Sequence, residues 1–225
     1  QIVTKALKDY GEVFKQKYIE WCNKKVSSFF DDIEDKYLSQ NKPVIFVIPE
    51  CNIKDWAYGE YECTVNWPTR DHSIGSIKGK LLSLDKYDAS GINLAKELVD
   101  KDPSNPCGYQ WLANYYYENK EYSKAYKYYV EALDTNIYRI GPPPAINSYI
   151  REAILENSKR KGLIILDLRE KLNDIEHGAI AGNNYFVDYC HLNVEGMNKV
   201  CHMLAGIITE ICGEEYQHDD FSISP

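Results

Sequence analysis

The chain has 225 residues, and its 34 Asp and Glu against 26 Lys and Arg give a formal net charge of -8. No basic stripe is present that could neutralise a phosphate backbone, so nucleic acid is not an expected partner. No apolar run approaches the roughly 20 residues needed to cross a bilayer, and no signal-peptide pattern opens the chain. We therefore expect a globular protein without a membrane partner.

Cysteine usage bears on the compartment. The seven cysteines show no C-x-x-C spacing, at positions 22, 51, 63, 107, 190, 201 and 212. A chain of this length does not need disulfides to stabilise its core. We therefore expect reduced thiols and a cytoplasmic location. Because the chain starts at Gln1 and enters a helical pattern at once, we also expect a further segment to precede it in the natural protein.

A helix followed by a buried strand is the pattern of the first 50 residues. Between residues 2 and 40 apolar side chains recur at helical intervals, which predicts one amphipathic helix, or two with a break near Ser27 and Ser28. The continuous apolar run from Val44 to Ile48 is typical of a strand buried on both faces of a parallel sheet. This order indicates an α/β protein.

Polar residues follow that strand directly. Ligands of open α/β sheets bind at the carboxyl ends of strands, so Asn52 and Asp55 stand where they could face a site. The same side chains could instead only cap the turn through bonds to the backbone. Residues 57–80 show no period and are rich in Tyr, Trp, Gly and Ser, which indicates a long irregular surface segment that covers part of the protein.

The section from Leu81 to Tyr138 predicts inserted helices. Large and small residues fall on the spacing of a tetratricopeptide repeat of about 34 residues, at Tyr109, Leu112, Ala113, Tyr116, Ala125, Tyr129 and Ala132. Residues 92–102 resemble the second helix of a degenerate preceding repeat. Because one and a half repeats cannot form a solenoid, these helices should pack on the α/β body or on a partner. Packing alone would explain them without a peptide-binding groove.

The rest of the chain predicts a second α/β unit. A Pro-rich return at residues 141–144 precedes a helix over residues 145–161 and a buried strand over residues 163–168, which should lie parallel to the first strand. A short helix over residues 169–174 and a closing helix over residues 194–212 follow. We expect an α/β body formed by residues 1–80 and 139–213. Residues 81–138 form the inserted helical part, and residues 214–225 form a flexible tail.

One loop near the C-terminus carries the pattern of a catalytic base. Asp188 stands three residues before His191, and a helical pattern begins at Val194. A carboxylate so placed can lie beside the imidazole and hold the ring in one tautomer, which is the base half of a nucleophilic triad. A D-x-x-H pair can also occur by chance.

The block from Val187 to Gly196 resembles the last block of the SGNH/GDSL hydrolase superfamily, Asp-x-x-His-x-x-x-x-Gly. The segment from Ile48 to Trp56 after a buried strand, and the segment from Ile146 to Arg151 before the second strand, support a resemblance to members with inserted tetratricopeptide-like helices. The resemblance covers roughly residues 40–212. It implies a three-layer α/β/α flavodoxin-like fold and a Ser-His-Asp triad, in which His191 is the general base and Asp188 orients it.

The chain departs from this family at the nucleophile. It lacks the Gly-Asp-Ser block and the Gly and Asn blocks that supply the oxyanion groups. Ser73 does not replace the missing serine, because it stands in the wrong place in chain order and not between a strand and a helix. We expect the missing groups N-terminal to Gln1 or on another chain.

Two further residues are candidates for substrate binding. Besides Asn52, these are Asn147 and Arg151, near the start of the predicted helix over residues 145–161, where an exposed N-terminus can receive an anionic group. A helix cap and a solvated cation are the alternative for the last two.

Two Cys-His pairs, Cys190-His191 and Cys201-His202, do not have the spacing of a zinc site, so we expect no metal and no cofactor. The expected function is that of a serine hydrolase or acyltransferase acting on an ester, thioester or acyl group, either free or carrier-bound. The alternative is a catalytically inactive interaction module, which docks a partner or carrier protein through the tetratricopeptide-like insert or a preceding segment.

Overall fold

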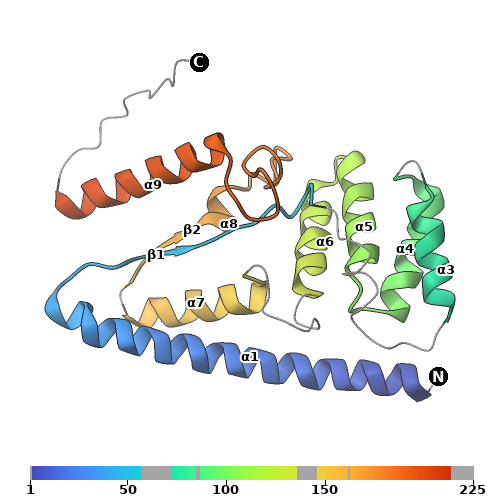
Figure 1. Cartoon of the computed structure of the whole chain (residues 1–225), viewed down its shortest axis with the longest axis horizontal. Helices are drawn as coiled ribbons and strands as arrows, with labels where there is room; N and C mark the ends of the chain where they lie inside the picture. Colours follow the sequence, from blue (N-terminus) through green and yellow to red (C-terminus); the bar gives the residue numbers. More distant parts are fainter. Residues whose placement is uncertain (1, 57–71, 85–86, 136–145, 162, 214–225) are drawn as a thin grey trace.

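The computed structural model describes residues 2–56, 72–84, 87–135, 146–161 and 163–213. In this part of the chain, helices cover both faces of a two-stranded parallel sheet, and a group of helices stands at one end of the sheet (Figure 1). The chain is therefore a mixed α/β protein, as the sequence predicted. No helix of the described part is both long enough and apolar enough to span a membrane.

The sheet consists of β1 (Ile45–Ile48) and β2 (Ile164–Asp167), which run parallel as predicted. Successive side chains of a strand point to opposite faces. Accordingly, Val47 and Leu166 pack on one face, while Phe46 and Ile165 pack on the other. Both faces are covered, which explains why the two strands are continuously apolar.

One face of the sheet is covered by α7 (Ser148–Lys161) and by α1 (Ile2–Lys36), which lies alongside α7 (Figure 1). α1 is a single unbroken helix, so the alternative with a break near Ser27 and Ser28 is wrong. Its Phe30 is fully buried in the core. A short 3-10 helix, η1 (Leu38–Gln40), leads out of α1.

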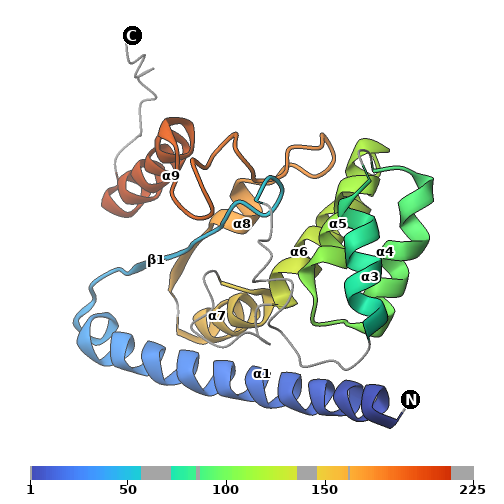
Figure 2. The same cartoon turned by 45° about the vertical axis from the view of Figure 1, so that its right-hand side comes forward.

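The opposite face is covered by α9 (Val194–Cys212), an arrangement that both views show (Figures 1 and 2). Between β2 and α9 come the short helix α8 (Leu168–Lys171) and a long loop. Leu172 of this region packs with Phe186 of the loop and Val200 of α9 in one core cluster. The loop that carries Asp188 and His191 is therefore anchored to the core just before its tip.

The inserted part contains α3 (His72–Leu82), α4 (Ala89–Lys101), α5 (Pro106–Glu118) and α6 (Tyr122–Asp134). α5 and α6 form the predicted hairpin. The small residues Ala113 and Ala125 are fully buried and Tyr129 fills the space beside them, as the repeat spacing predicted.

The expectation of an irregular segment over residues 57–80 is wrong for its last part, because α3 begins at His72. Ile74, Ile77 and Leu81 of this helix are buried against α4 and α5. Its exposed face carries Gly75 and Gly79, and glycine has a poor helix propensity that hides the apolar period. The predicted boundary at residue 81 falls inside α3, and the division into domains stays a prediction. Residues 57–71, the Pro-rich return and the tail lie outside the described residues.

A buried ion pair joins the ends of the two strands. Arg169 Nε and Nη2 donate to the two carboxylate oxygens of Glu50 at 3.1 and 3.3 Å, and the two residues are 4% and 6% exposed. Glu50 also accepts bonds from the Cys51 N–H and from Asn173 Nδ2, while Arg169 Nη2 donates to the Ile146 carbonyl at 2.6 Å. Burial alone would lower the pKa of Arg169, but the Glu50 carboxylate outweighs burial and raises it. Buried charges need such complete pairing.

Replacement of Glu50 tests this pair. Glu50→Gln keeps the shape but leaves the Arg169 guanidinium buried without a counter-charge, so we expect a loss of about 3–5 kcal/mol in the free energy of unfolding, measured by urea denaturation. The control is Lys171→Gln, which removes an exposed ion pair with Glu170 on the same helix, α8. That change should cost less than about 1 kcal/mol. Equal losses in the two variants would contradict a structural role for the buried pair.

Candidate functional site

Backbone hydrogen bonds place the Asp188 loop at the carboxyl end of β1. The Asn52 N–H donates to the Tyr189 carbonyl at 2.9 Å, and the Lys54 N–H donates to the Ala181 carbonyl at 3.2 Å. The segment after β1 therefore runs alongside the later loop over more than one point of contact. This is the edge of a parallel sheet at which ligands commonly bind.

The loop itself is closed by two further backbone bonds. The Val187 N–H donates to the His191 carbonyl, and the Asn193 N–H donates to the Tyr185 carbonyl, both at 2.9 Å. Phe186 is buried in the core at the base of the loop. Asp188 and His191 are thus held on one tight turn whose stem is fixed on both sides.

The predicted base and its carboxylate do meet. His191 Nδ1 lies 2.8 Å from Asp188 Oδ2, and Asp188 Oδ1 accepts the backbone N–H groups of His191 at 2.9 Å and Cys190 at 3.0 Å. The backbone N–H of His191 first, then that of Cys190 and the imidazole, lower the pKa of Asp188 to about 2. A carboxylate only accepts hydrogen bonds, so Nδ1 of the neutral ring carries the proton and Nε2 keeps its lone pair.

The lone pair of Nε2 faces no hydroxyl in the described part of the chain. Among the described residues none hydrogen-bonds to Nε2, and the His191 side chain is 75% exposed. Ser73 lies in α3, where its Oγ accepts a bond from Lys101 Nζ at 2.7 Å. A nucleophile for His191 would therefore have to approach from outside the described residues.

A second D-x-x-H pair, which sequence reasoning did not consider, shows how little the spacing alone means. His177 Nδ1 lies 2.8 Å from Asp174 Oδ2, and both side chains are exposed. Among the described residues, the one backbone N–H that donates to the Asp174 carboxylate is that of His177, at 3.4 Å. The Asp188 carboxylate accepts two shorter backbone bonds, and its loop contacts the segment after β1. These features, and not the spacing, set the Asp188 pair apart.

Asn52 and Asp55 fasten the two loops to each other. Asn52 is buried, its Nδ2 donates to Asn183 Oδ1 at 2.8 Å, and its Oδ1 accepts the Asp55 N–H at 2.9 Å. Asp55 Oδ2 accepts the Asn183 N–H at 2.8 Å. The Asn52 Oδ1 bond is the expected turn cap, whereas the other two bonds join separate loops. A substrate contact of Asn52 stays a prediction.

Asn147 and Arg151 each bind polar groups of the protein itself. Asn147 is fully buried and caps α7 by accepting the Ile150 N–H at 3.0 Å, while its Nδ2 donates to Tyr18 Oη at 3.0 Å. Arg151 donates to Asp167, the last residue of β2. The cap occupies the N-terminus of α7, as the helix-cap alternative expected for Asn147. A substrate role of Asn147 and Arg151 stays a prediction.

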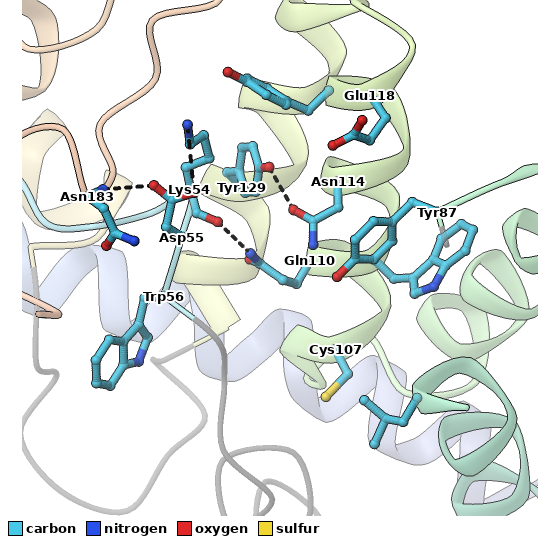
Figure 3. A pocket seen from close by; sticks show the side chains of 13 residues that line it. Lys54, Asp55, Trp56, Tyr87, Cys107, Gln110, Asn114, Glu118, Tyr129 and Asn183 are labelled. Atoms are coloured by element: carbon cyan, nitrogen blue, oxygen red, sulfur yellow. Dashed lines mark hydrogen bonds and ion pairs between the residues drawn. The ribbon is translucent and has the colours of Figure 1, made fainter. Parts of the chain in front are cut away.

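A cavity of about 530 Å³ lies between α5 and the segment after β1 (Figure 3). Its polar wall includes Gln110 and Asn114 of α5, and its aromatic wall includes Trp56, Tyr87 and Trp111. Gln110 Nε2 donates to the Lys54 carbonyl at 3.1 Å, whereas Gln110 Oε1 is buried and has no hydrogen-bond partner among the described residues. Sequence reasoning missed this cavity, because the repeat spacing shows which residues pack and not which remain open.

The cavity adjoins the His191 loop. The Trp56 ring lies 5.5 Å from the ring of Tyr189, the residue after Asp188. Asn183, which lines the cavity, accepts a bond from Asn193 Nδ2 through its carbonyl at 3.0 Å. The same loop residues therefore border the cavity and support the turn that carries the base.

The cysteines near this site differ from each other. Cys51 is buried, and burial raises the pKa of its thiol. Cys190 is exposed, with its Sγ 3.9 Å from His191 Nδ1. Cys107 is disulfide-bonded, so the expectation of reduced thiols throughout is wrong at this residue. The cytoplasmic location stays a prediction, and Cys107 no longer supports it.

No protein-family model matches the chain, and comparison with curated proteins and with solved structures gives no match. The resemblance to the SGNH/GDSL superfamily therefore rests on the residues themselves.

The structure explains why the block ends in glycine. Asn193 caps α9 by accepting the Gly196 N–H at 2.9 Å. A Cβ atom on Gly196 would lie 2.3 Å from the Tyr185 carbonyl oxygen, which accepts one of the two bonds that close the loop. Only a residue without a Cβ allows this approach of α9 to the stem of the loop.

Gly196→Ala should therefore displace the Tyr185 carbonyl and loosen the loop. We expect a loss of about 1–3 kcal/mol in the free energy of unfolding, as for other overpacked sites. Gly206→Ala in the same helix is the matched control, because nothing lies within 4 Å of its added Cβ. That variant should gain about 0.5–1 kcal/mol from the better helix propensity of alanine. Urea denaturation of both variants measures the difference, and a shift of the same sign in both would refute the close-approach argument.

Proposed function

We propose that Asp188 and His191 are the base half of an acyl-transfer site, in a serine hydrolase or acyltransferase of the SGNH/GDSL type. The observation that carries this proposal is the hydrogen bond of 2.8 Å between His191 Nδ1 and Asp188 Oδ2, on a loop at the carboxyl end of β1. The lone pair on Nε2 is then directed away from the carboxylate and is available to a hydroxyl group.

The proposed reaction follows from this tautomer. A serine hydroxyl gives its proton to Nε2 while its oxygen attacks the carbonyl carbon of an ester, thioester or other acyl group. The Asp188 carboxylate, ionised because of its lowered pKa, stabilises the imidazolium that forms. The imidazolium then gives the proton to the leaving group, and water or another hydroxyl or amine takes the acyl group from the enzyme. The serine and the oxyanion donors come from outside the described residues.

The layer order supports the proposed flavodoxin-like, three-layer arrangement. α9 covers one face of the parallel sheet, and α7 with α1 covers the other (Figures 1 and 2). In such sheets the ligand lies beyond the carboxyl ends of the strands. The cavity between Trp56 and Gln110 is at this edge, and we assign it to the part of the substrate, or of its carrier, that lies remote from the acyl bond.

The second candidate is an interaction module without catalysis. It is favoured by one observation, the lack of a hydroxyl within hydrogen-bond distance of His191 Nε2 among the described residues. In that case the helical insert would dock a partner or carrier protein.

A fluorophosphonate probe separates the two candidates when it is applied to the protein as the cell makes it. The probe should label one serine, and His191→Gln should slow labelling at least about 10³-fold, because the base that activates the serine is lost. His177→Gln is the matched control, since it removes the imidazole of the other exposed D-x-x-H pair. Equal labelling of wild type and His191→Gln would exclude His191 as the base. A wild-type protein that takes no label would favour the interaction module.

Replacement of the carboxylate tests the orienting role. Asp188→Asn keeps the size of the side chain, but its amide can donate to Nδ1 and so favour the wrong tautomer. We expect a fall of roughly 10⁴-fold in kcat for ester hydrolysis with a small change in KM, as for other triads that lose this carboxylate. Asp174→Asn should leave kcat unchanged. A similar kcat for Asp188→Asn and wild type would show that Asp188 does not orient the base.

A further inference from the structure

We propose that Asp188, Cys190 and His191 form a zinc-binding site, and that bound zinc switches off the base. The ligand atoms of the three residues lie within 4.8 Å of one another. Carboxylate oxygen, thiolate sulfur and imidazole nitrogen are the three ligand types that Zn²⁺ prefers in proteins. This set differs from the paired Cys-His arrangement considered from the sequence, because neither Cys201 nor His202 belongs to the group.

The two distances to His191 Nδ1 leave little rearrangement to be made. Zinc bonds of about 2.3 Å to sulfur and about 2.0 Å to nitrogen, at a tetrahedral angle, place the two ligand atoms about 3.6 Å apart. Cys190 Sγ lies 3.9 Å from His191 Nδ1. Asp188 Oδ2 lies 2.8 Å from Nδ1 and has to move outward by about 0.5 Å to share the metal. Water completes the four ligands, and the exposed position of the turn lets the ion enter.

The turn is built to hold these ligands in place. Asp188 Oδ1 is fixed by the backbone N–H groups of Cys190 and His191, so the other carboxylate oxygen remains directed at the side chains of the same two residues. The closed stem, from the Tyr185 carbonyl to the Asn193 N–H, holds the backbone of the turn. The metal would therefore replace one hydrogen bond of a turn that is already formed.

Binding redistributes protons in a defined way. The Cys190 thiol gives its proton to solvent and forms the zinc–sulfur bond. Nδ1 gives up its proton to form the zinc–nitrogen bond, and the neutral ring carries its proton on Nε2 instead. In total, one proton leaves per zinc ion bound. With a proton on Nε2 the ring has no lone pair for the serine, so zinc-bound protein cannot use His191 as a base. This last step rests on the proposed function, whereas the metal site does not.

Cobalt(II), a spectroscopic substitute for zinc, gives a direct test without catalysis. Addition of Co²⁺ to the protein, in which Cys190 is a free thiol, should produce a thiolate-to-cobalt absorption band in the near ultraviolet, and Zn²⁺ should abolish it. Cys190→Ser should remove the band and weaken zinc binding at least about tenfold. Cys201→Ser is the matched control, because it removes an exposed thiol that also precedes a histidine, and it should keep both the band and the affinity.

The outcomes separate the site from the catalytic proposal. A band that is missing from wild type, or that survives in Cys190→Ser, overturns the zinc site. A band that depends on Cys190 establishes the site even if the fluorophosphonate probe never labels the protein, which would count only against the hydrolase. If the probe does label the protein, Zn²⁺ should slow labelling of wild type and of Cys201→Ser, and should have at least about tenfold less effect on Cys190→Ser.

Discussion

The ion pair between Glu50 and Arg169 is the constraint on which the carboxyl edge of the sheet depends. Glu50 follows β1, Arg169 follows β2, and the Arg169 guanidinium also holds the Ile146 carbonyl just before α7. The segments after β1, after β2 and before α7 meet at this edge. A two-stranded sheet has few backbone hydrogen bonds with which to hold all three in place. Because both charges are buried, neither can turn to solvent without losing its partner, so the chain has one arrangement at this edge. The loops above it are built on that arrangement.

The His191 turn shows how a common pair becomes a specific one. Asp174 and His177 have the same spacing and the same distance of 2.8 Å, so formation of the pair is a local property of a turn. What Asp188 has in addition comes from further away, through the bond from the Asn52 N–H to the Tyr189 carbonyl and the approach of Gly196 to the Tyr185 carbonyl. These contacts fix the position of the imidazole relative to the sheet, and a catalytic base needs such a fixed position.

Local patterns in the sequence predicted the elements well, because helix and strand periods are local. The boundaries of α9, the parallel pair of strands and the hairpin of α5 and α6 all follow from such patterns. α3 was missed because Gly75 and Gly79 weaken its period. The sequence left the roles of Asn147 and Arg151 open, because a polar residue at a helix start looks the same whether its partner is a ligand or another side chain. Their partners here, Tyr18 and Asp167, are distant in sequence.

The helical insert contacts the segments that surround the candidate site, and these contacts help to explain its position in the fold. Gln110 of α5 donates to the Lys54 carbonyl, and Tyr117 Oη donates to the Gly178 carbonyl at 3.1 Å, so the insert holds both of the segments that flank the His191 turn. An insert used only for packing would need no open space at this contact. The contact instead borders a cavity of about 530 Å³, with Gln110 in its wall (Figure 3). A ligand bound there would contact the insert and the base-bearing loops at once.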